Sequence, residues 1–161
     1  LAATETNTAK SLLRALENTG DQDVLWLNGD VVFDANLLPL LRPHIERDES
    51  FVSVNHAAVG DEEVKYDLDG RGAIRNLSKS VVDGLGEAVG VNHVSAAHKG
   101  ELMSRLEQCA DDDYFERGIE LSINHDGAQY IPVDVTASVC IEVDFAEDLA
   151  RANEAITHTS G

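Results

Sequence analysis

The chain has 161 residues, of which 43% are apolar, and this is enough for one domain with a buried core. Its 30 acidic residues outnumber 12 Lys and Arg residues, and the net charge of −18 argues against binding to nucleic acid or to an anionic membrane. No stretch approaches the ~18 apolar residues of a membrane span, and Cys109 and Cys140 are too few for a disulfide framework, so we expect a reducing, cytoplasmic setting.

The first half of the chain alternates helical and strand patterns. A helix begins after the capping side chains of 6–8, carries an apolar stripe at i, i+3, i+4 and i+7, and ends before Gly20. A strand at 24–30 follows, and Asp34 can cap a short helix after it. The remaining elements are a strand at 51–54 and a hairpin whose strands, 64–68 and 73–77, flank the turn Asp69-Gly70.

The second half continues the alternation. It predicts a strand at 87–94 interrupted by Gly90, helices at 99–109 and 114–125, strands at 129–133 and 139–144, and a last helix at 146–156. Alternating strands and helices predict an α/β domain over residues 1–156, with a mixed, mainly parallel sheet flanked by helices, and a frayed tail at 157–161. No glycine-rich phosphate-binding loop occurs in the sequence.

Two aspartates end apolar strands. Asp30 closes the strand at 24–30 and Asp144 closes the strand at 139–144, 114 positions later. Ligands of open α/β sheets bind beyond the carboxyl ends of the strands, so the two carboxylates can converge on one Mg²⁺, an ion usually held by one or two carboxylates and substrate phosphates. The simpler interpretation is that each aspartate caps the helix that follows it.

Several segments together resemble the C-terminal two-thirds of the nucleotidyltransferases that join a nucleoside triphosphate to a phosphorylated acceptor. The similar segments are Glu5–Leu12, Leu27–Asp30, Asp69–Lys79, Gly86–Val91, Asp113–Glu116, and Ile141–Asp144 with Glu147–Leu149. The branch that the chain resembles most comprises cytidylyltransferases for phosphocholine and related aminoalkyl phosphates or phosphonates. The resemblance implies a Rossmann-like fold of the GT-A type. The family's N-terminal G-x-G-x-R…P-K segment is absent, so we expect either a portion of a longer protein or a non-catalytic relative.

The resemblance also implies a site. Asp30 and Asp144 would hold Mg²⁺ and act as the catalytic metal ligands, and Lys79 would contact phosphate unless it is a solvated strand-end lysine. For a cationic acceptor head group the resemblance offers an aromatic ring and carboxylates, namely Tyr114, Glu116 and Glu142. Glu87 would bond an acceptor hydroxyl, and Asn7 and Ser11 would contact the nucleotide, although capping explains Asn7 nearly as well.

The predicted function is therefore Mg²⁺-dependent transfer of a nucleotidyl group, with CTP favoured, to a small phosphorylated acceptor such as phosphocholine, with release of pyrophosphate. One alternative keeps the fold and takes a sugar 1-phosphate or polyol phosphate as acceptor. Another is a non-catalytic nucleotide-binding module. The expected partners are the nucleoside triphosphate and the acceptor, and a homo-oligomer is compatible with the sequence. The acidity fits a salt-rich cytoplasm or, more simply, an ordinary solvated surface.

Overall fold

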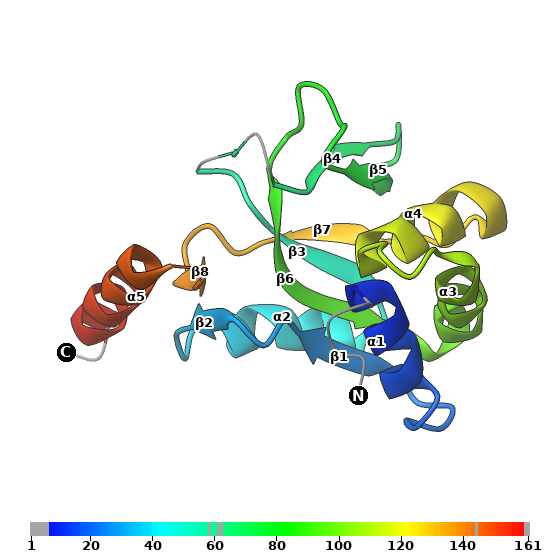
Figure 1. The fold of residues 1–161 in the computed structure, drawn as a ribbon, viewed down its shortest axis with the longest axis horizontal. Coiled ribbons are helices and arrows are strands. Elements are labelled where there is room, and N and C mark those ends of the chain that lie inside the picture. Colours follow the sequence, from blue (N-terminus) through cyan, green and yellow to red (C-terminus); the bar gives the residue numbers. More distant parts are fainter. Residues whose placement is uncertain (1–6, 58, 61–62, 144, 160–161) are drawn as a thin grey trace.

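A mixed sheet forms the centre of the computed structural model, which describes residues 7–57, 59–60, 63–143 and 145–159 (Figure 1). Its strands are paired in the order β5-β4-β6-β3-β7, and β1 pairs with β6. A separate two-stranded sheet joins β2 to β8. The strands are β1 (Val24–Leu27), β2 (Val31–Phe33), β3 (Phe51–Asn55), β4 (Lys65–Leu68), β5 (Ile74–Ser78), β6 (Glu87–Val94), β7 (Ile131–Asp134) and β8 (Cys140–Glu142).

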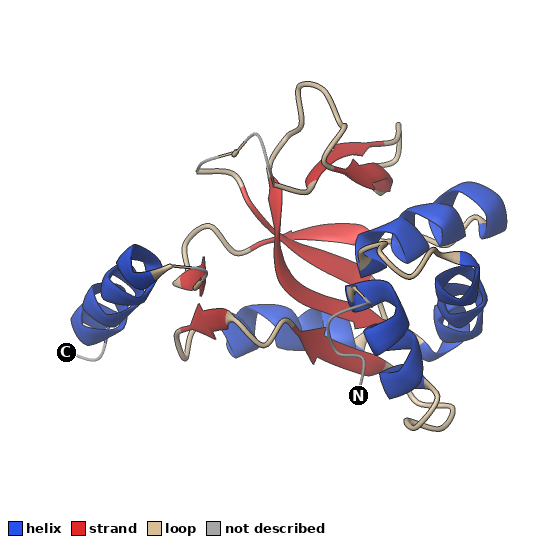
Figure 2. Cartoon of the chain, viewed as in Figure 1, coloured by secondary structure: helices blue, strands red, loops and turns tan. Residues whose placement is uncertain are grey.

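Helices cover both faces of the sheet (Figure 2). They are α1 (Thr8–Leu16), α2 (Leu37–Glu46), α3 (Ala96–Gln108), α4 (Phe115–Asp126) and α5 (Ala146–Thr159). Apolar residues of α1, α3 and α4 pack with Val52 and Val54 of β3 in one core. Leu37 and Leu41 of α2 pack with Phe51 and with strands β6 and β7 in a second core on the other face. The three-layer arrangement confirms the predicted α/β class.

The sheet is mixed, as expected, but it contains more antiparallel pairs than the expectation of a mainly parallel sheet implies. Among the described strands, β3 and β7 pair in parallel, whereas β6 runs antiparallel to β1, β3 and β4, and β4 runs antiparallel to β5. Parallel neighbours need a crossover connection, usually a helix. The described part of 56–86 contains strands β4 and β5 but no helix, so these strands join through hairpins and loops instead.

Local sequence signals explain most element boundaries. Asn7 is the N-cap of α1, and its side chain accepts a hydrogen bond from the Thr8 backbone N–H at 2.8 Å. The Asp69 carboxylate accepts bonds from the backbone N–H groups of Arg71 (2.8 Å) and Ala73 (3.0 Å) and so closes the β4–β5 turn. Gly127, with φ +73°, ends α4 in the left-handed conformation.

Asp34 does more than precede a helix. It is buried, and its carboxylate accepts from the backbone N–H groups of Asn36 (2.9 Å) and Val139 (3.2 Å). The N-cap of α2 is Asn36, so Asp34 supports the preceding turn and links it to the chain entering β8.

The C-terminal helix α5 lies apart from α1, α3 and α4, at the opposite end of the molecule (Figure 1). It extends to Thr159, so the first three residues of the predicted tail at 157–161 are helical, and the last two lie outside the described residues. Within the part of the chain that the structure describes, no helix has the length and apolar character needed to cross a membrane.

Candidate functional site

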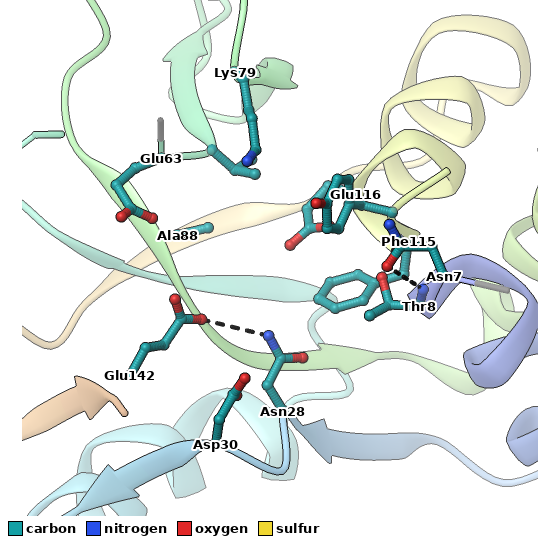
Figure 3. A pocket seen from close by; sticks show the side chains of 12 residues that line it. Asn7, Thr8, Asn28, Asp30, Glu63, Lys79, Ala88, Phe115, Glu116 and Glu142 are labelled. Atoms are coloured by element: carbon teal, nitrogen blue, oxygen red, sulfur yellow. Dashed lines mark hydrogen bonds between the residues drawn. The ribbon is translucent and has the colours of Figure 1, made fainter. Parts of the chain in front are cut away.

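Two adjoining cavities lie where β1, β6, β8 and the start of α4 approach one another. The first has a volume of about 400 Å³ and the second about 390 Å³, and Glu63, Ala88 and Glu142 line both. The other residues of the first cavity are Asn7, Thr8, Asn28, Asp30, Val64, Lys79, Tyr114, Phe115 and Glu116. The labelled side chains point from separate elements toward a common space (Figure 3). Carboxylates dominate this space.

The end of β1 delivers Asn28 and Asp30 to the first cavity. The Asn28 backbone N–H donates to the carbonyl oxygen of Gly90 at 2.9 Å, and the Asn28 carbonyl oxygen accepts from the Val31 N–H at 3.3 Å, which turns the chain after β1. The Asn28 side-chain Nδ2 donates to Glu142 Oε1 at 3.5 Å (Figure 3). The Val143 backbone N–H donates to the Asp30 carbonyl oxygen at 2.9 Å. These bonds hold the ends of β1 and β8 together beside the cavity.

Gly90 makes this arrangement sterically possible. Its φ is +73°, a conformation that residues with a Cβ rarely adopt. A Cβ at this position would lie 2.8 Å from Asn28 Nδ2 and 3.0 Å from Val31 Cγ2. The sequence predicted an interruption of the strand at Gly90; the structure has one continuous strand, β6, with an irregular register against β3 between Val52 and Val54.

A set of hydrogen bonds that we call the α1–α4 clasp positions the opposite wall. The Asn7 backbone N–H donates to the Asp111 carbonyl oxygen (2.7 Å), and Asn7 Nδ2 donates to the Asp112 carbonyl oxygen (3.1 Å). The Phe115 backbone N–H donates to Thr8 Oγ1 at 3.0 Å. Phe115 also packs edge-on against Trp26, with ring centroids 5.6 Å apart. The first turns of α1 and α4 are therefore fixed to each other.

Glu116 is a buried acid in this wall. It is 8% exposed, and its Oε2 has no hydrogen-bond partner among the described residues. Burial raises the pKa of the Glu116 carboxyl to about 7. The backbone N–H of Glu116 and the positive charge of Lys79 lower this pKa, whereas the negative charge of Glu142 raises it. A carboxyl that has a pKa near neutral pH and faces a cavity is a candidate for binding a cation or a hydroxyl group.

Tyr114 and Lys79 meet at the mouth of the first cavity. Tyr114 precedes α4 and is 47% exposed. The Lys79 ammonium lies over the Tyr114 ring, with Nζ 5.1 Å from the ring centroid. Lys79 is the one basic residue that lines the first cavity among the residues described.

Glu87 belongs to the second cavity. It accepts a hydrogen bond from the Gly60 backbone N–H at 3.1 Å. Burial raises the pKa of the Glu87 carboxyl above its usual value, and the negative charge of Glu63 adds to the shift, whereas the bond from Gly60 opposes it. Phe145, which precedes α5, and Arg151, within it, also line this cavity.

The structure brings most of the predicted site residues together. Asp30, Lys79, Tyr114, Glu116 and Glu142 line the first cavity, as does Asn7, and Glu87 lines the second together with Glu142. The Asn7 side chain caps α1, as the simpler interpretation of this residue predicted, and it also takes part in the clasp. Ser11 is exposed, bonds back to the Asn7 carbonyl oxygen at 3.5 Å, and lies outside both cavities. Asp144 lies outside the described residues.

Sequence reasoning missed Asn28 and Glu63 as residues of the cavity. Asn28 could have been found, because alternate residues of the predicted strand at 24–30 share a face and Asn28 is two positions before Asp30, although the observed chain turns at 29–30. Glu63 carries no comparable signal, because it lies outside the strands, two positions before β4 begins at Lys65.

The oxygen atoms near the end of β1 suit a hard divalent cation. The Asp30 side chain is exposed to the cavity and makes no hydrogen bond or ion pair with a described residue. Among the described residues no group of three or more His, Cys, Asp or Glu side chains is arranged to hold a metal ion alone. Mg²⁺ does not need such a group, because substrate phosphates and water usually complete its ligands.

No family profile and no curated protein matches the sequence, whereas many solved structures share the fold. An inositol-1-phosphate CTP transferase from T. maritima aligns with a TM-score of 0.76 and 16% identity over 95% of this chain and 62% of its own. A UDP-glucose pyrophosphorylase, solved with UDP-glucose, aligns with a TM-score of 0.73 and 8% identity over 97% of this chain and 64% of its own. A CTP:phosphocholine cytidylyltransferase from Streptococcus pneumoniae aligns with a TM-score of 0.68 and 14% identity over 93% of this chain and 64% of its own. The chain thus has the fold of nucleotidyltransferases and spans less than two thirds of each of these proteins.

Proposed function

We propose that this chain forms the metal- and acceptor-binding part of a Mg²⁺-dependent nucleotidyltransferase. In this proposal the donor is a nucleoside triphosphate, with CTP favoured, and the acceptor is a small phosphate or phosphonate with a cationic head group, such as phosphocholine. The observation that carries the proposal is the first cavity itself. On a fold shared with nucleotidyltransferases, it gathers Asp30, Glu142, Glu116, Tyr114 and Lys79 around one space.

The proposed reaction needs no covalent nucleophile from the protein. An acceptor phosphate oxygen attacks the α-phosphorus of the nucleotide, a new P–O bond forms, and the bond to the bridging oxygen breaks as pyrophosphate leaves. Positioning and neutralisation of charge account for most of the catalysis in phosphoryl transfer of this kind. The task of the chain is therefore to hold two polyanions in line.

Asp30 and Asp144 would hold Mg²⁺ in the proposed enzyme. Support comes from the exposed Asp30 carboxylate and from the bond between the Val143 N–H and the Asp30 carbonyl, which joins the β1 and β8 ends. Mg²⁺, when bound, supplies positive charge to the phosphate oxygens and orients them. Asn28 orients Glu142 through the 3.5 Å hydrogen bond and so shapes the acceptor side of the site.

The head group of the acceptor would contact Tyr114, Glu116 and Glu142. An aromatic face with nearby carboxylates attracts a quaternary or primary ammonium through its ring electrons and through direct charge interaction. The cavity offers few basic residues to bind an anionic head, because Lys79 is the basic residue among its described lining. The excess of carboxylates therefore favours an acceptor that is positively charged at the end away from its phosphate.

The test is pyrophosphate release with Mg²⁺, crossing four nucleoside triphosphates with phosphocholine, 2-aminoethylphosphonate and sugar 1-phosphates. It should be run on the 161-residue chain and on the longest natural gene product that contains it. Turnover should require CTP and an aminoalkyl acceptor, and Asp30→Asn should lower kcat/KM by about 100-fold or more, equivalent to about 3 kcal/mol. Asp21→Asn, a loss of the same charge at an exposed site outside both cavities, should leave turnover unchanged. No turnover by either form would favour the non-catalytic module.

A sugar 1-phosphate or polyol phosphate is the second candidate acceptor. Glu87 favours it, because its partly buried carboxyl lines the second cavity and can bond a hydroxyl group. Tyr114→Leu separates the two candidates. It should raise the acceptor KM strongly for a cationic acceptor and should change the KM little for a sugar phosphate.

A further inference from the structure

Lys79 is placed unusually for a basic residue in an acidic cavity. Asp30, Glu63, Glu116 and Glu142 line the same cavity, yet the Lys79 ammonium makes no hydrogen bond or ion pair with a described residue. It lies instead over the Tyr114 ring, 5.1 Å from the centroid. A lysine ammonium in this position has the charge and the ring contact that an ammonium ligand would have.

We propose that Lys79 determines acceptor specificity by competing for the cation site: its ammonium occupies the face of Tyr114 until the cationic head group of the acceptor displaces it. This inference rests on the acceptor class of the proposed function. The new element is that a lysine of the site itself competes with the acceptor head group for the Tyr114 ring. An acceptor with a positive head group replaces the lost contact with an equivalent one, whereas a neutral head group leaves the ring and the surrounding carboxylates without a cation.

The position of Lys79 in the chain allows this exchange. Lys79 follows directly after β5, which ends at Ser78, and its side chain is long and flexible. Tyr114 is 47% exposed, so its side chain is accessible to a ligand from solvent. Glu116, which lines the same cavity from the first turn of α4, is buried, so its carboxyl has less room to move than the Lys79 side chain. The moving part is therefore one side chain.

The experiment measures tetramethylammonium binding by calorimetry to a set of four proteins: the unchanged chain, Lys79→Met, Tyr114→Leu and the double variant. Lys79→Met should tighten binding about 2- to 5-fold, the range expected for loss of one competing exposed cation–π contact. In the Tyr114→Leu background the same substitution should have no effect, because the ring for which the two cations compete is gone. Tyr114→Phe, which keeps the ring, should preserve the effect of Lys79→Met.

Removing Lys79 also removes a positive charge, and a second lysine provides the control. Lys65, in the neighbouring strand β4, does not line the first cavity, so Lys65→Met removes the same charge without touching the ring. It should not reproduce the gain in affinity. Equal gains for both lysine variants, a gain from Lys79→Met that persists undiminished in the Tyr114→Leu background, weaker binding in Lys79→Met, or no binding to any protein would each overturn the inference.

The probe separates this inference from the proposed function. Tetramethylammonium carries no phosphate, so its binding does not depend on nucleotidyl transfer. Coupling between Lys79 and Tyr114 without turnover would support the cation site and refute the proposed enzyme. Turnover with sugar phosphates and no tetramethylammonium binding would refute the competition and leave a nucleotidyltransferase.

Discussion

Gly90→Ala tests whether the conformation of β6 determines the position of Asn28 at the cavity. An alanine at φ +73° costs about 1–2 kcal/mol in backbone strain. Its methyl group would also lie 2.8 Å from Asn28 Nδ2 and 3.0 Å from Val31 Cγ2, and overpacking of this kind costs about 1–3 kcal/mol. The lower freedom of alanine in the unfolded chain offsets about 0.4–1 kcal/mol. We expect a net loss of about 3 kcal/mol in the free energy of unfolding, which lowers the Tm by about 6–12 °C.

Two other glycines provide matched controls for this substitution in urea unfolding followed by circular dichroism. Gly20 has φ +63° with no atom within 4 Å of an added Cβ, so Gly20→Ala measures strain without the contact. Gly100 lies inside α3 with open space around it, so Gly100→Ala should stabilise the protein by about 0.5–1 kcal/mol.

The difference between Gly90→Ala and Gly20→Ala isolates the contact with Asn28 and Val31. We expect Gly90→Ala to cost at least about 1 kcal/mol more than Gly20→Ala, and we expect Asn28→Ala to recover part of that difference. Equal losses at the two glycines would refute the argument, because strain alone would then explain both and Asn28 would not depend on the absence of a Cβ at residue 90.

Two further predictions concern buried ionisable groups. Glu116→Gln should change the dependence of stability on pH: because the folded pKa is raised from 4.5 to about 7, the unchanged protein should lose about 3 kcal/mol relative to the variant as pH rises from about 4.5 through 7. Urea unfolding of both proteins at pH 5 and pH 8 measures this, and a constant difference between them would contradict it. Lys99→Met should lower the free energy of unfolding by about 2 kcal/mol, because the buried Lys99 ammonium donates to Thr19 Oγ1 and to the carbonyl oxygens of Gly20 (2.5 Å) and Gln22 (3.2 Å). An unchanged urea midpoint would show that water satisfies these acceptors.

Local sequence patterns were sufficient where local chemistry decides the structure. The strand at 87–94 has its predicted bounds, and the turn at Asp69-Gly70 forms the predicted hairpin, because the Asp69 side chain itself bonds the turn. The patterns failed where distant residues decide. The predicted strand at 24–30 ends at Leu27, and a separate strand begins at Val31, because the Val31 N–H bonds back to the Asn28 carbonyl in a turn and Val31 pairs with Glu142.

The same distinction applies to the site. Asp30 was predicted from its place at a strand end, and Glu116 and Glu142 were predicted from the family resemblance; all three line the first cavity. The burial of Glu116 was not predicted, because the residue type favours an exposed position in a first turn and the packing of α4 against the sheet overrides it. The contact between Lys79 and Tyr114 joins residues 35 positions apart and has no signature in the spacing of the sequence.

The α1–α4 clasp has a consequence for engineering this protein. Residues 7–8 and 111–115 hold one another through several hydrogen bonds, although about 100 positions of sequence separate them. Substitutions on the two sides will not add independently, because the first one that breaks the clasp releases the partners of the others. A graft that transfers α4 with Tyr114 and Glu116 to a related scaffold should therefore carry Asn7 and Thr8 with it, since these two short segments form one inseparable unit of design.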